Sequence, residues 1–595
     1  MVVIGANEQT ATIVKSSLRN PDVEYVLIQT RKDVESERAK LELYLTEEEE
    51  KKLVFYYGNR ALYEDIETLR LERAYPEVYI LGEDLAFENE GDHDSYNITC
   101  LEHIKQYVKG HPQLSQSETR LKCHVNFEYQ STFMAFKFTH VYKSLNKKIE
   151  FVPFNVHDIW AKKVLVDNYA RIPDRLHSET RRLDYHPLDA YWETSKEDGK
   201  KQISYINEDS PQTVHLIVVG MNQMGVALAM QAALLVHLPN YQKAPSHSLR
   251  TTITFIDEQA TREGEYLRSR YEAFFALCRY RVIKSSEDTF NTAKRDYVMP
   301  WTDPMKDGRY AYMGENFMDV QWEFIEGNIA SHEIRSYMTA VAANTGYKTT
   351  TIAVCFKNPQ KAIATALYLP EMVLRRALQV LVYQENSYEI INKVGMTEPV
   401  WKRYAKLKPF GMIADGFSID TFDNMMAKYV NMAYADKLQS VLSEDDKEYN
   451  AERADALWNE LGIVHKYSNI DLVDSFEMKL RSLGASEDEQ RAGLKNQALV
   501  DNLAKAEHQR WLTECLTMGY RPLDKTEFDT YMSAKDKKAM KKFFKEKSRA
   551  HVDICSHEAQ QDGRDVEAQQ NNMDERIIRM ILPLKRLVQN KREQQ

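Results

Sequence analysis

The sequence has 595 residues, of which 43% are hydrophobic and 28% charged, with 21 glycines and a formal net charge of −10 at pH 7. This composition excludes a fibrous or low-complexity protein, and the acidic balance argues against a dedicated nucleic-acid binder. The six cysteines lack the CxxC spacing of a structural zinc site, so we expect no metal and a reducing, cytoplasmic compartment.

The chain opens on the apolar run VVIGAN, in which Gly5 and Asn7 follow a predicted strand. The run is short and no basic residues precede it, which is unlike a signal peptide. A second predicted strand, LVFYYGN, ends in Gly58 and Asn59 and leads into a helical pattern. Both stretches therefore predict a strand, a tight turn and a helix.

The most apolar stretch is VHLIVVGMNQMGVALAMQAALL, residues 214–235. Its polar residues and Gly-Met-Asn break favour a strand and a helix over a membrane span. Gly220, Asn222 and Gly225 occupy the three places of the G-x-G-x-x-G dinucleotide fingerprint, with Asn222 adding bulk where a pyrophosphate would approach. Asp257 ends the next strand, TTITFIDE, where an acid could bind a ribose, although it lies farther along than the usual spacing of about 20 residues.

Four landmarks recur in the same order and indicate an internal repeat. VVIGAN pairs with LIVVGMN, and LVFYYGN pairs with WEFIEGN, which contains Gly327 and Asn328. PEVYILGED (76–84) pairs with TTIAVCFKNP (350–359), and VPFN (152–155) pairs with KPFG (408–411). Strands that alternate with helices predict an α/β fold with two Rossmann-like, doubly wound parallel sheets and right-handed crossovers.

The predicted domains follow from this repeat. The first covers residues 1–195 and the second covers 212–435, with an insertion at about 261–315 between its second and third strands and a charged linker at 195–212. The second copy is the better nucleotide candidate, because the first has Thr10 at the place of Gly225 and no acid after its second strand. The alternative that both copies keep only the fold stays open.

No catalytic signature stands out. Val226 and Ala227 replace the Lys and Ser/Thr of a P-loop, and no GxSxG or HExxH motif occurs. Tyr-x-x-x-Lys pairs occur about as often as chance predicts for this composition. We therefore expect a non-catalytic protein, with an NAD(P)-dependent oxidoreductase or nucleotide-processing enzyme as an open alternative.

The third predicted region, 450–595, is mainly helical and contains NLAKAEHQRWLTECLTMGYRP (502–522). Glu507, Arg510 and Trp511 share one helix face, where Trp511 could stack on a base and Arg510 could pair with a phosphate. A core Trp511 and a structural Glu507–Arg510 ion pair are equally simple. The basic run at 533–549 favours a solvated insertion with two anchoring aromatic residues over an anion-binding surface.

These motifs also resemble two known families. LVFYYGNRALYEDIETLRLERAYPEVYILGED, followed by HDSYNITCLEHI, resembles the TrkA-N or RCK type of Rossmann domain, with Asn59 and Asn328 where that family has Asp. Residues 502–522 resemble the signature helix of the RyR domain, named for the ryanodine receptor repeats, and 551–560 and 574–587 are similar to the rest of that module. The matching RyR residues are Glu507, His508, Arg510, Trp511, Gly519, Tyr520 and Arg521.

The resemblances imply a nucleotide-sensing regulatory or effector protein in which ligand binding shifts the domain arrangement. Regulation of ion channels or transport and antiviral nucleotide signalling are the implied settings. The implied ligand is NAD(H) or an adenine nucleotide. The implied partners are further copies of the chain and a membrane channel or signalling protein, with no nucleic acid. Membrane association would come only through a partner or a further N-terminal segment. A structural scaffold without a ligand is the remaining alternative.

The candidate site residues form two sets. The cofactor-binding set comprises Gly5, Asn7, Gly58, Asn59, Gly220, Asn222, Gly225, Asp257, Gly327 and Asn328. The RyR-pocket set comprises Glu507, His508, Arg510, Trp511 and Tyr520.

Overall fold

In the computed structural model the chain forms two compact units. Unit 1 comprises Met1–Trp160 and Gly411–Asp423, and unit 2 comprises Ala161–Phe410 and Asn424–Gln595. The structure describes all residues except 74–76, 85, 86, 89, 138, 140, 141, 143, 144, 146, 147, 169–171, 175–180, 184, 185, 195–198, 200, 244–248, 286–289, 292–295, 298, 314–316, 386–403, 405, 413–423, 437–450, 556–567 and 593–595.

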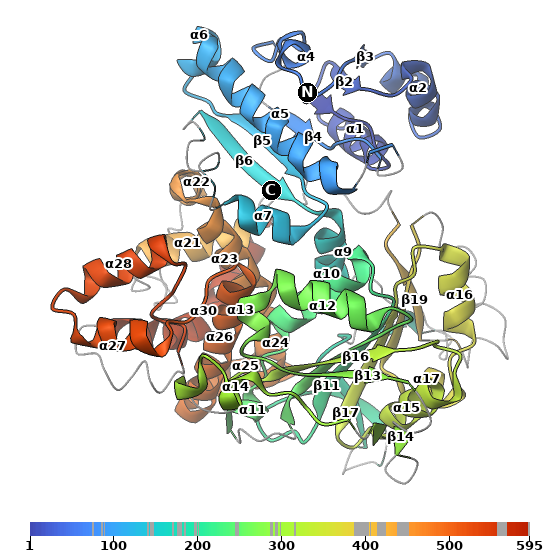
Figure 1. The fold of residues 1–595 in the computed structure, drawn as a ribbon, viewed down its shortest axis with the longest axis vertical. Helices are drawn as coiled ribbons and strands as arrows, with labels where there is room; N and C mark the ends of the chain where they lie inside the picture. Colours follow the sequence, from blue (N-terminus) through green and yellow to red (C-terminus); the bar gives the residue numbers. More distant parts are fainter. Residues whose placement is uncertain are drawn as a thin grey trace. The chain divides into compact units, whose positions relative to one another are not determined.

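Unit 1 is built on a six-stranded parallel sheet with the order β3-β2-β1-β4-β5-β6 (Figure 1). Its strands are β1 (Val2–Ile4), β2 (Val26–Thr30), β3 (Leu53–Tyr57), β4 (Glu77–Ile80), β5 (Leu121–Asn126) and β6 (Ile149–Phe154). The main helices are α1 (Thr10–Leu18), α2 (Val34–Glu42) and α5 (Glu90–Gly110), joined by the short α3 (Glu47–Glu50) and α4 (Tyr63–Glu67). The strand order reverses between β1 and β4, and ligands of open α/β sheets bind beyond such a point.

Unit 2 repeats this order and adds one strand. Its parallel sheet runs β13-β16-β12-β11-β17-β18-β19. The strands are β11 (Thr213–Val219), β12 (Thr251–Asp257), β13 (Arg279–Lys284), β16 (Val320–Glu326), β17 (Lys348–Val354), β18 (Gln379–Tyr383) and β19 (Leu407–Phe410). The predicted α/β class with two parallel sheets is confirmed. The four landmark pairs lie on matching strands, namely β1 and β11, β3 and β16, β4 and β17, and β6 and β19.

Helices cover both faces of the unit 2 sheet. Helices α15 (His332–Ala343), α16 (Pro359–Leu367) and α17 (Glu371–Arg376) share one hydrophobic core with the sheet. On the other face, α10 (Gln223–Leu235) and α12 (Ala260–Arg270) approach so closely that a Cβ at Gly225 would lie 3.1 Å from Val218 Cγ1. A Cβ at Gly264 would likewise lie 2.7 Å from Phe324 Cδ1. Glycine therefore sets the close helix–sheet distance on this second face.

The C-terminal helices belong to unit 2. They are α21 (Met425–Ala435), α22 (Ala451–Glu460), α23 (Ile463–Asp474), α24 (Phe476–Leu483), α25 (Glu487–Lys495), α26 (Gln497–Thr517), α27 (Lys525–Ser533), α28 (Lys537–Lys547) and α30 (Ala568–Arg592). Helix α26 contacts α30 on one side, and α10, α11 (Pro239–Lys243) and α13 (Glu272–Phe275) from the Rossmann-like part (Figure 1). The strandless character expected of this region matches the described residues, apart from an isolated bridge between Arg521 and Ala550.

The apolar character of residues 214–235 has a simple cause in this arrangement. Strand β11 lies inside the sheet, and α10 is buried almost all round because it lies between the sheet and α26. A helix that is apolar on every side is expected in such a position. None of the helices that the structure describes has the length and apolar character needed to cross a membrane.

Two expectations need correction. The predicted linker 195–212 contains β10 (Lys201–Tyr205), which pairs antiparallel with β9 (Ala190–Thr194), and Ile203 and Tyr205 pack against Ala190 and Leu378 of unit 2. The apolar residues of this strand are hidden among charges in the sequence. In the basic run, Phe544 anchors α28 in a small core, but Phe543 is 53% exposed, so only one of the two aromatic residues is an anchor.

Candidate functional site at the strand ends and the aromatic cluster

The two glycines of the unit 2 turn have packing roles. Gly220 has a φ of +100°, and a Cβ there would lie 2.8 Å from the carbonyl oxygen of Cys355 on the neighbouring strand end. A Cβ at Gly225 would lie 2.4 Å from the oxygen of Gly220. These are the tight-turn and helix-packing roles of the first and third glycines in a dinucleotide fingerprint.

Asn222 takes the place of the middle glycine and closes the turn with its own side chain. Its Oδ1 accepts a hydrogen bond from the Gly225 amide at 2.9 Å, and its Nδ2 donates to the Cys355 carbonyl. The amide of Gly225 is thereby used internally as an N-cap contact. A pyrophosphate cannot use that amide unless the Asn222 side chain moves.

Asp257 lies at the end of β12, directly beside this turn. Its Oδ2 accepts a hydrogen bond from the Met221 amide at 3.0 Å, and its Oδ1 accepts one from the Gln259 amide at 2.8 Å. The residue is only partly buried. Because each carboxylate oxygen has two lone pairs, this fixed carboxylate retains capacity to accept hydroxyl groups such as those of a ribose.

The remaining unit 2 candidates lie at the end of β16, next to Asp257. The Gly327 amide donates to the backbone oxygen of Asp257 at 3.1 Å. Asn328 Oδ1 accepts from the Ala330 amide at 2.8 Å, and its Nδ2 donates to Glu258 at 3.4 Å. The structure thus brings all the unit 2 candidates together at the carboxyl ends of neighbouring strands. Asn328 acts there as a turn residue.

The unit 1 candidates also lie at the carboxyl ends of the strands, where each is engaged by neighbouring groups of unit 1. Gly5 has a φ of +87°, and a Cβ there would lie 2.4 Å from the oxygen of Gly82. Asn7 Nδ2 donates to the Leu81 oxygen at 3.3 Å, and a Cβ at Gly58 would meet Gln29 Nε2 at 2.6 Å. Asn59 Oδ1 accepts from the Ala61 amide at 3.0 Å.

Glu83 lies among the carboxyl ends of the unit 1 strands, and the sequence motifs did not identify it. Its carboxylate is 2% exposed and accepts from the amides of Ala6 at 3.0 Å and Arg31 at 2.8 Å, and from the hydroxyl of Thr30 at 2.9 Å. Glu83 follows β4, whereas its partners follow β1 and end β2. The Glu83 carboxylate thus already accepts the hydrogen bonds that these two amides and this hydroxyl could give to an anionic ligand.

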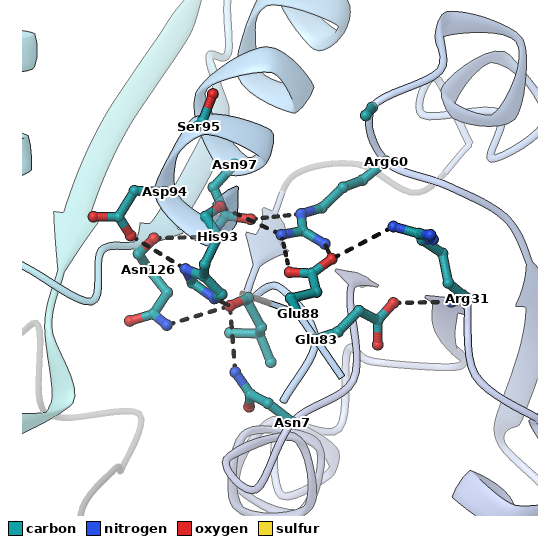
Figure 2. Close-up of polar contacts among 12 residues, drawn as sticks. Asn7, Arg31, Arg60, Glu83, Glu88, His93, Asp94, Ser95, Asn97 and Asn126 are labelled. Carbon is teal, nitrogen blue, oxygen red and sulfur yellow. Dashed lines mark hydrogen bonds and ion pairs between the residues drawn. The ribbon is translucent and has the colours of Figure 1, made fainter. Parts of the chain in front are cut away.

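A buried ion pair lies beside Glu83 (Figure 2). Arg60 donates two hydrogen bonds to Glu88, both of 2.7 Å, and its Nε donates to Asn97 at 2.7 Å. Arg31, which is partly exposed, lies 3.9 Å from the same Glu88. Burial alone would raise the pKa of Glu88, but the hydrogen bonds and charge of Arg60 lower it below its usual value.

The network continues through the start of α5 (Figure 2). His93 lies 3.1 Å from Asp94 through Nδ1 and 3.0 Å from the Leu81 oxygen through Nε2, and Asn126 Nδ2 donates to that same oxygen at 3.2 Å. A Cβ at Gly82 would lie 2.1 Å from His93 Nε2. The polar residues after LGED and at the start of HDSYN were the sequence signal for this network.

In the RyR-like region, Glu507 and Arg510 are turned into the unit. Arg510 is 2% exposed, contacts Glu507 at 2.8 Å and Glu514 at 2.8 Å, and Lys479 of α24 lies 2.7 Å from Glu507. Burial would raise the pKa of Glu507, but Arg510 and Lys479 lower it. This geometry is that of a structural ion network, and it leaves Arg510 no open side toward a ligand.

Trp511 and Tyr520 are only partly buried and gather around His551. The ring centroids of Trp511 and His551 are 5.3 Å apart, and those of Tyr520 and His551 are 5.9 Å apart, both edge-on. The Lys545 ammonium lies 5.5 Å from the Tyr520 ring. His508 is buried and its Nε2 lies 2.9 Å from the Cys555 oxygen. Trp511, Tyr520, His551 and Lys545 are called the aromatic cluster below.

Residues 556–560 of the stretch that resembles the rest of the RyR module lie outside the described residues. Within the part of the chain that is described, no group of three His, Cys, Asp or Glu side chains is placed to hold a metal ion. No protein-family model matches the chain, and no curated protein matches it. The resemblances to TrkA-N and RyR domains therefore rest on the motifs alone.

Proposed function

We propose that the chain is a nucleotide-responsive regulatory protein that binds its ligand at the strand ends of unit 2. The ribose hydroxyls of NAD(H) or an adenine nucleotide would donate hydrogen bonds to the Asp257 carboxylate. Two backbone amides already hold this carboxylate in place. A fixed acceptor lowers the ordering cost of binding. The phosphate would meet the start of α10, where the helix dipole favours negative charge.

The observation that carries this proposal is the position of α10. Its N-terminal turn contains Asn222 and Gly225, next to Asp257, and its length is buried between the sheet and α26. A close-packed helix transmits a displacement because interiors have few voids to absorb it. Helix α26 carries Trp511, so a shift at the strand ends would reach the aromatic cluster.

Ligand binding must favour one of two arrangements for this response to occur. The Asn222 side chain provides such a choice, because it bonds Gly225 in the structure and would have to turn away for a phosphate to reach that amide. Binding then changes the N-cap of α10. The ligand shifts the population only by its difference in affinity for the two arrangements.

The test is a thermal-shift panel of NAD(H), NADP(H), ATP, ADP, ADP-ribose and cyclic nucleotides on the full chain. A ligand at about 100 times its Kd should stabilise the protein by about 2.7 kcal/mol. Asp257→Ala should weaken binding at least about tenfold, because ribose hydroxyls lose a charged acceptor. Glu258→Ala, at the next and more exposed position, is the matched control and should bind as the parent does.

The outcomes separate the alternatives. Loss of binding in Trp511→Ala with unchanged binding in Asp257→Ala would move the site to the aromatic cluster. Turnover of a nucleotide by the purified protein would indicate an enzyme at the same sheet edge. No stabilisation by any member of the panel would contradict the nucleotide proposal and leave a scaffold.

A further inference from the structure

Strand β3 forms one edge of the unit 1 sheet, next to β2. Lys52 accepts a hydrogen bond from the Val26 amide at 2.9 Å, and the Gly58 amide donates to Thr30 at 3.0 Å. Backbone groups alternate in direction along a strand, so the even-numbered residues of β3 serve β2. The amides and carbonyls of Leu53, Phe55 and Tyr57 consequently face away from the sheet.

Unit 2 shows what this edge can hold. Its β16 matches β3, because Gly327 donates to Asp257 just as Gly58 donates to Thr30. Strand β13, from the insertion, pairs with β16 on its outer side. The Ser285 amide donates at 2.9 Å to the oxygen of Glu326, which is the residue that matches Tyr57. Among the described residues, no strand takes the place of β13 in unit 1.

Strand β3 itself carries none of the usual protection against pairing with another chain, although Lys51 and Lys52 directly precede it. Natural edge strands are blunted by lysine, proline or a bulge, but β3 reads LVFYY. Exposed apolar side chains lie on both faces of the strand and just after α2, where Tyr57 is 77% and Leu43 81% exposed. These residues are Leu43, Tyr44, Val54, Tyr56 and Tyr57.

We propose that β3 pairs with β3 of a second copy of the chain, in antiparallel orientation, to join two unit 1 sheets into one. A two-fold axis makes a strand its own partner, and two identical strands related by it run antiparallel. Pairing centred on Phe55 places Leu53 opposite Tyr57 of the other copy. All three outward-facing residues of each strand then form hydrogen-bonded pairs, giving about six hydrogen bonds.

The charges beside β3 favour this orientation. The acidic helix α3 (Glu47–Glu50) ends shortly before the strand. Antiparallel pairing keeps the two α3 helices at opposite ends of the joint, whereas parallel pairing would place them side by side and add repulsion between like charges. Of the two orientations in which a second copy could pair with this edge, the antiparallel one thus avoids that repulsion. This interface is independent of the proposed nucleotide site in unit 2.

Sedimentation of the full chain with Tyr57→Pro tests the interface. Proline removes an outward-facing amide and leaves the ladder with β2 intact, so the dimer dissociation constant should rise at least about tenfold through two lost hydrogen bonds. Tyr57→Thr retains the amide and should remain dimeric. An unchanged melting temperature of Tyr57→Pro would show that unit 1 still folds. A monomeric parent, or a dimer that Tyr57→Pro leaves unaffected, overturns the proposal.

Disulfide trapping tests the orientation and register. Pairing centred on Phe55 places Val54 opposite Tyr56 of the other copy, with Cα atoms about 4.5 Å apart. In a Cys555→Ser background, which removes the one cysteine that is not buried, Val54→Cys with Tyr56→Cys should oxidise to a covalent dimer. Val54→Cys alone should not, because two copies of position 54 would be roughly 8 Å apart. Failure of the double variant to cross-link, or equal cross-linking of the single variant, overturns the register.

Discussion

At the carboxyl ends of the strands, both units bind the same backbone amide with a carboxylate, but the carboxylate comes from a different strand in each unit. In each unit the amide that follows the first glycine donates to a carboxylate at 3.0 Å. In unit 1 the amide belongs to Ala6 and the carboxylate is Glu83, after the fourth strand of the repeat. In unit 2 the amide belongs to Met221 and the carboxylate is Asp257, at the end of the second strand.

The positions of the acidic and basic residues that follow the second and fourth strands of the repeat are reversed between the two units. Unit 1 has Arg31 and Lys32 after its second strand, with Glu83 after its fourth, whereas unit 2 has Asp257 after its second strand and Lys357 after its fourth. Glu83 is enclosed, while Asp257 is partly open. The repeat therefore preserves an amide–carboxylate contact, but only in unit 2 is the carboxylate partly open to solvent.

The largest expected effect is a loss of stability when the buried Arg60–Glu88 ion pair of unit 1 is broken. Arg60→Met leaves the Glu88 carboxylate buried without its bidentate partner, and should lower the free energy of unfolding of unit 1 by about 3–5 kcal/mol. Hydrogen exchange of peptides from β1 to β6 would measure this separately from unit 2.

Arg31→Met is the matched control for that change, since Arg31 contacts the same Glu88 but is 36% exposed. Its cost should remain below about 1 kcal/mol, because solvent screens an exposed pair. Equal losses of stability in the two variants would contradict the conclusion that Arg60 is the buried partner of Glu88 and Arg31 an exposed one.

The next effect compares the two carboxylates directly. Glu83→Ala leaves two amides and one hydroxyl without their acceptor in a buried place, and should destabilise unit 1 by about 2–3 kcal/mol. Asp257→Ala should cost unit 2 only about 1 kcal/mol, because water can reach a partly open edge. Urea unfolding followed by hydrogen exchange in each unit would provide both values. A larger cost for Asp257→Ala would reverse the comparison.

The smallest of the three expected effects concerns acid. His215 in β11 is buried, and burial first, then the charge of Lys348, lower its pKa from 6.5 to about 3, although Glu323 opposes this. The unfolded chain therefore takes up a proton near pH 6.5 that the folded unit 2 does not. This contribution to stability is complete above that pH and is lost as the pH falls toward 3.

Between pH 7 and pH 5, unit 2 should lose about 2 kcal/mol of stability through His215. His215→Gln keeps a hydrogen-bonding side chain beside Thr254 and should remove that part of the pH dependence. The measurement is urea unfolding of both proteins at the two pH values. The same slope in parent and variant would show that His215 is not the titrating group.

The sequence by itself determined the elements and their order. Apolar strand runs, Gly-x-Asn turns and helical patterns are local features, so the matches between β1 and β11 and between β4 and β17 could be predicted from letters alone. Local pattern also identified Gly220 and Gly225, although the structure shows that Gly220 is required by the carbonyl of the distant Cys355. It missed β10, because the two apolar residues of this strand, Ile203 and Tyr205, lie in a stretch flanked by charged residues.

Only the tertiary structure decided which polar groups meet. Ala6 and Glu83 are 77 positions apart, and Lys479 reaches Glu507 from another helix, so no local pattern reveals either contact. Burial likewise turned Arg510 from a candidate ligand contact into part of an ion network. Hydrophobic periodicity acts over one turn or one strand, whereas the partner of a buried charge is chosen by whatever the folded chain places within a few ångströms of it.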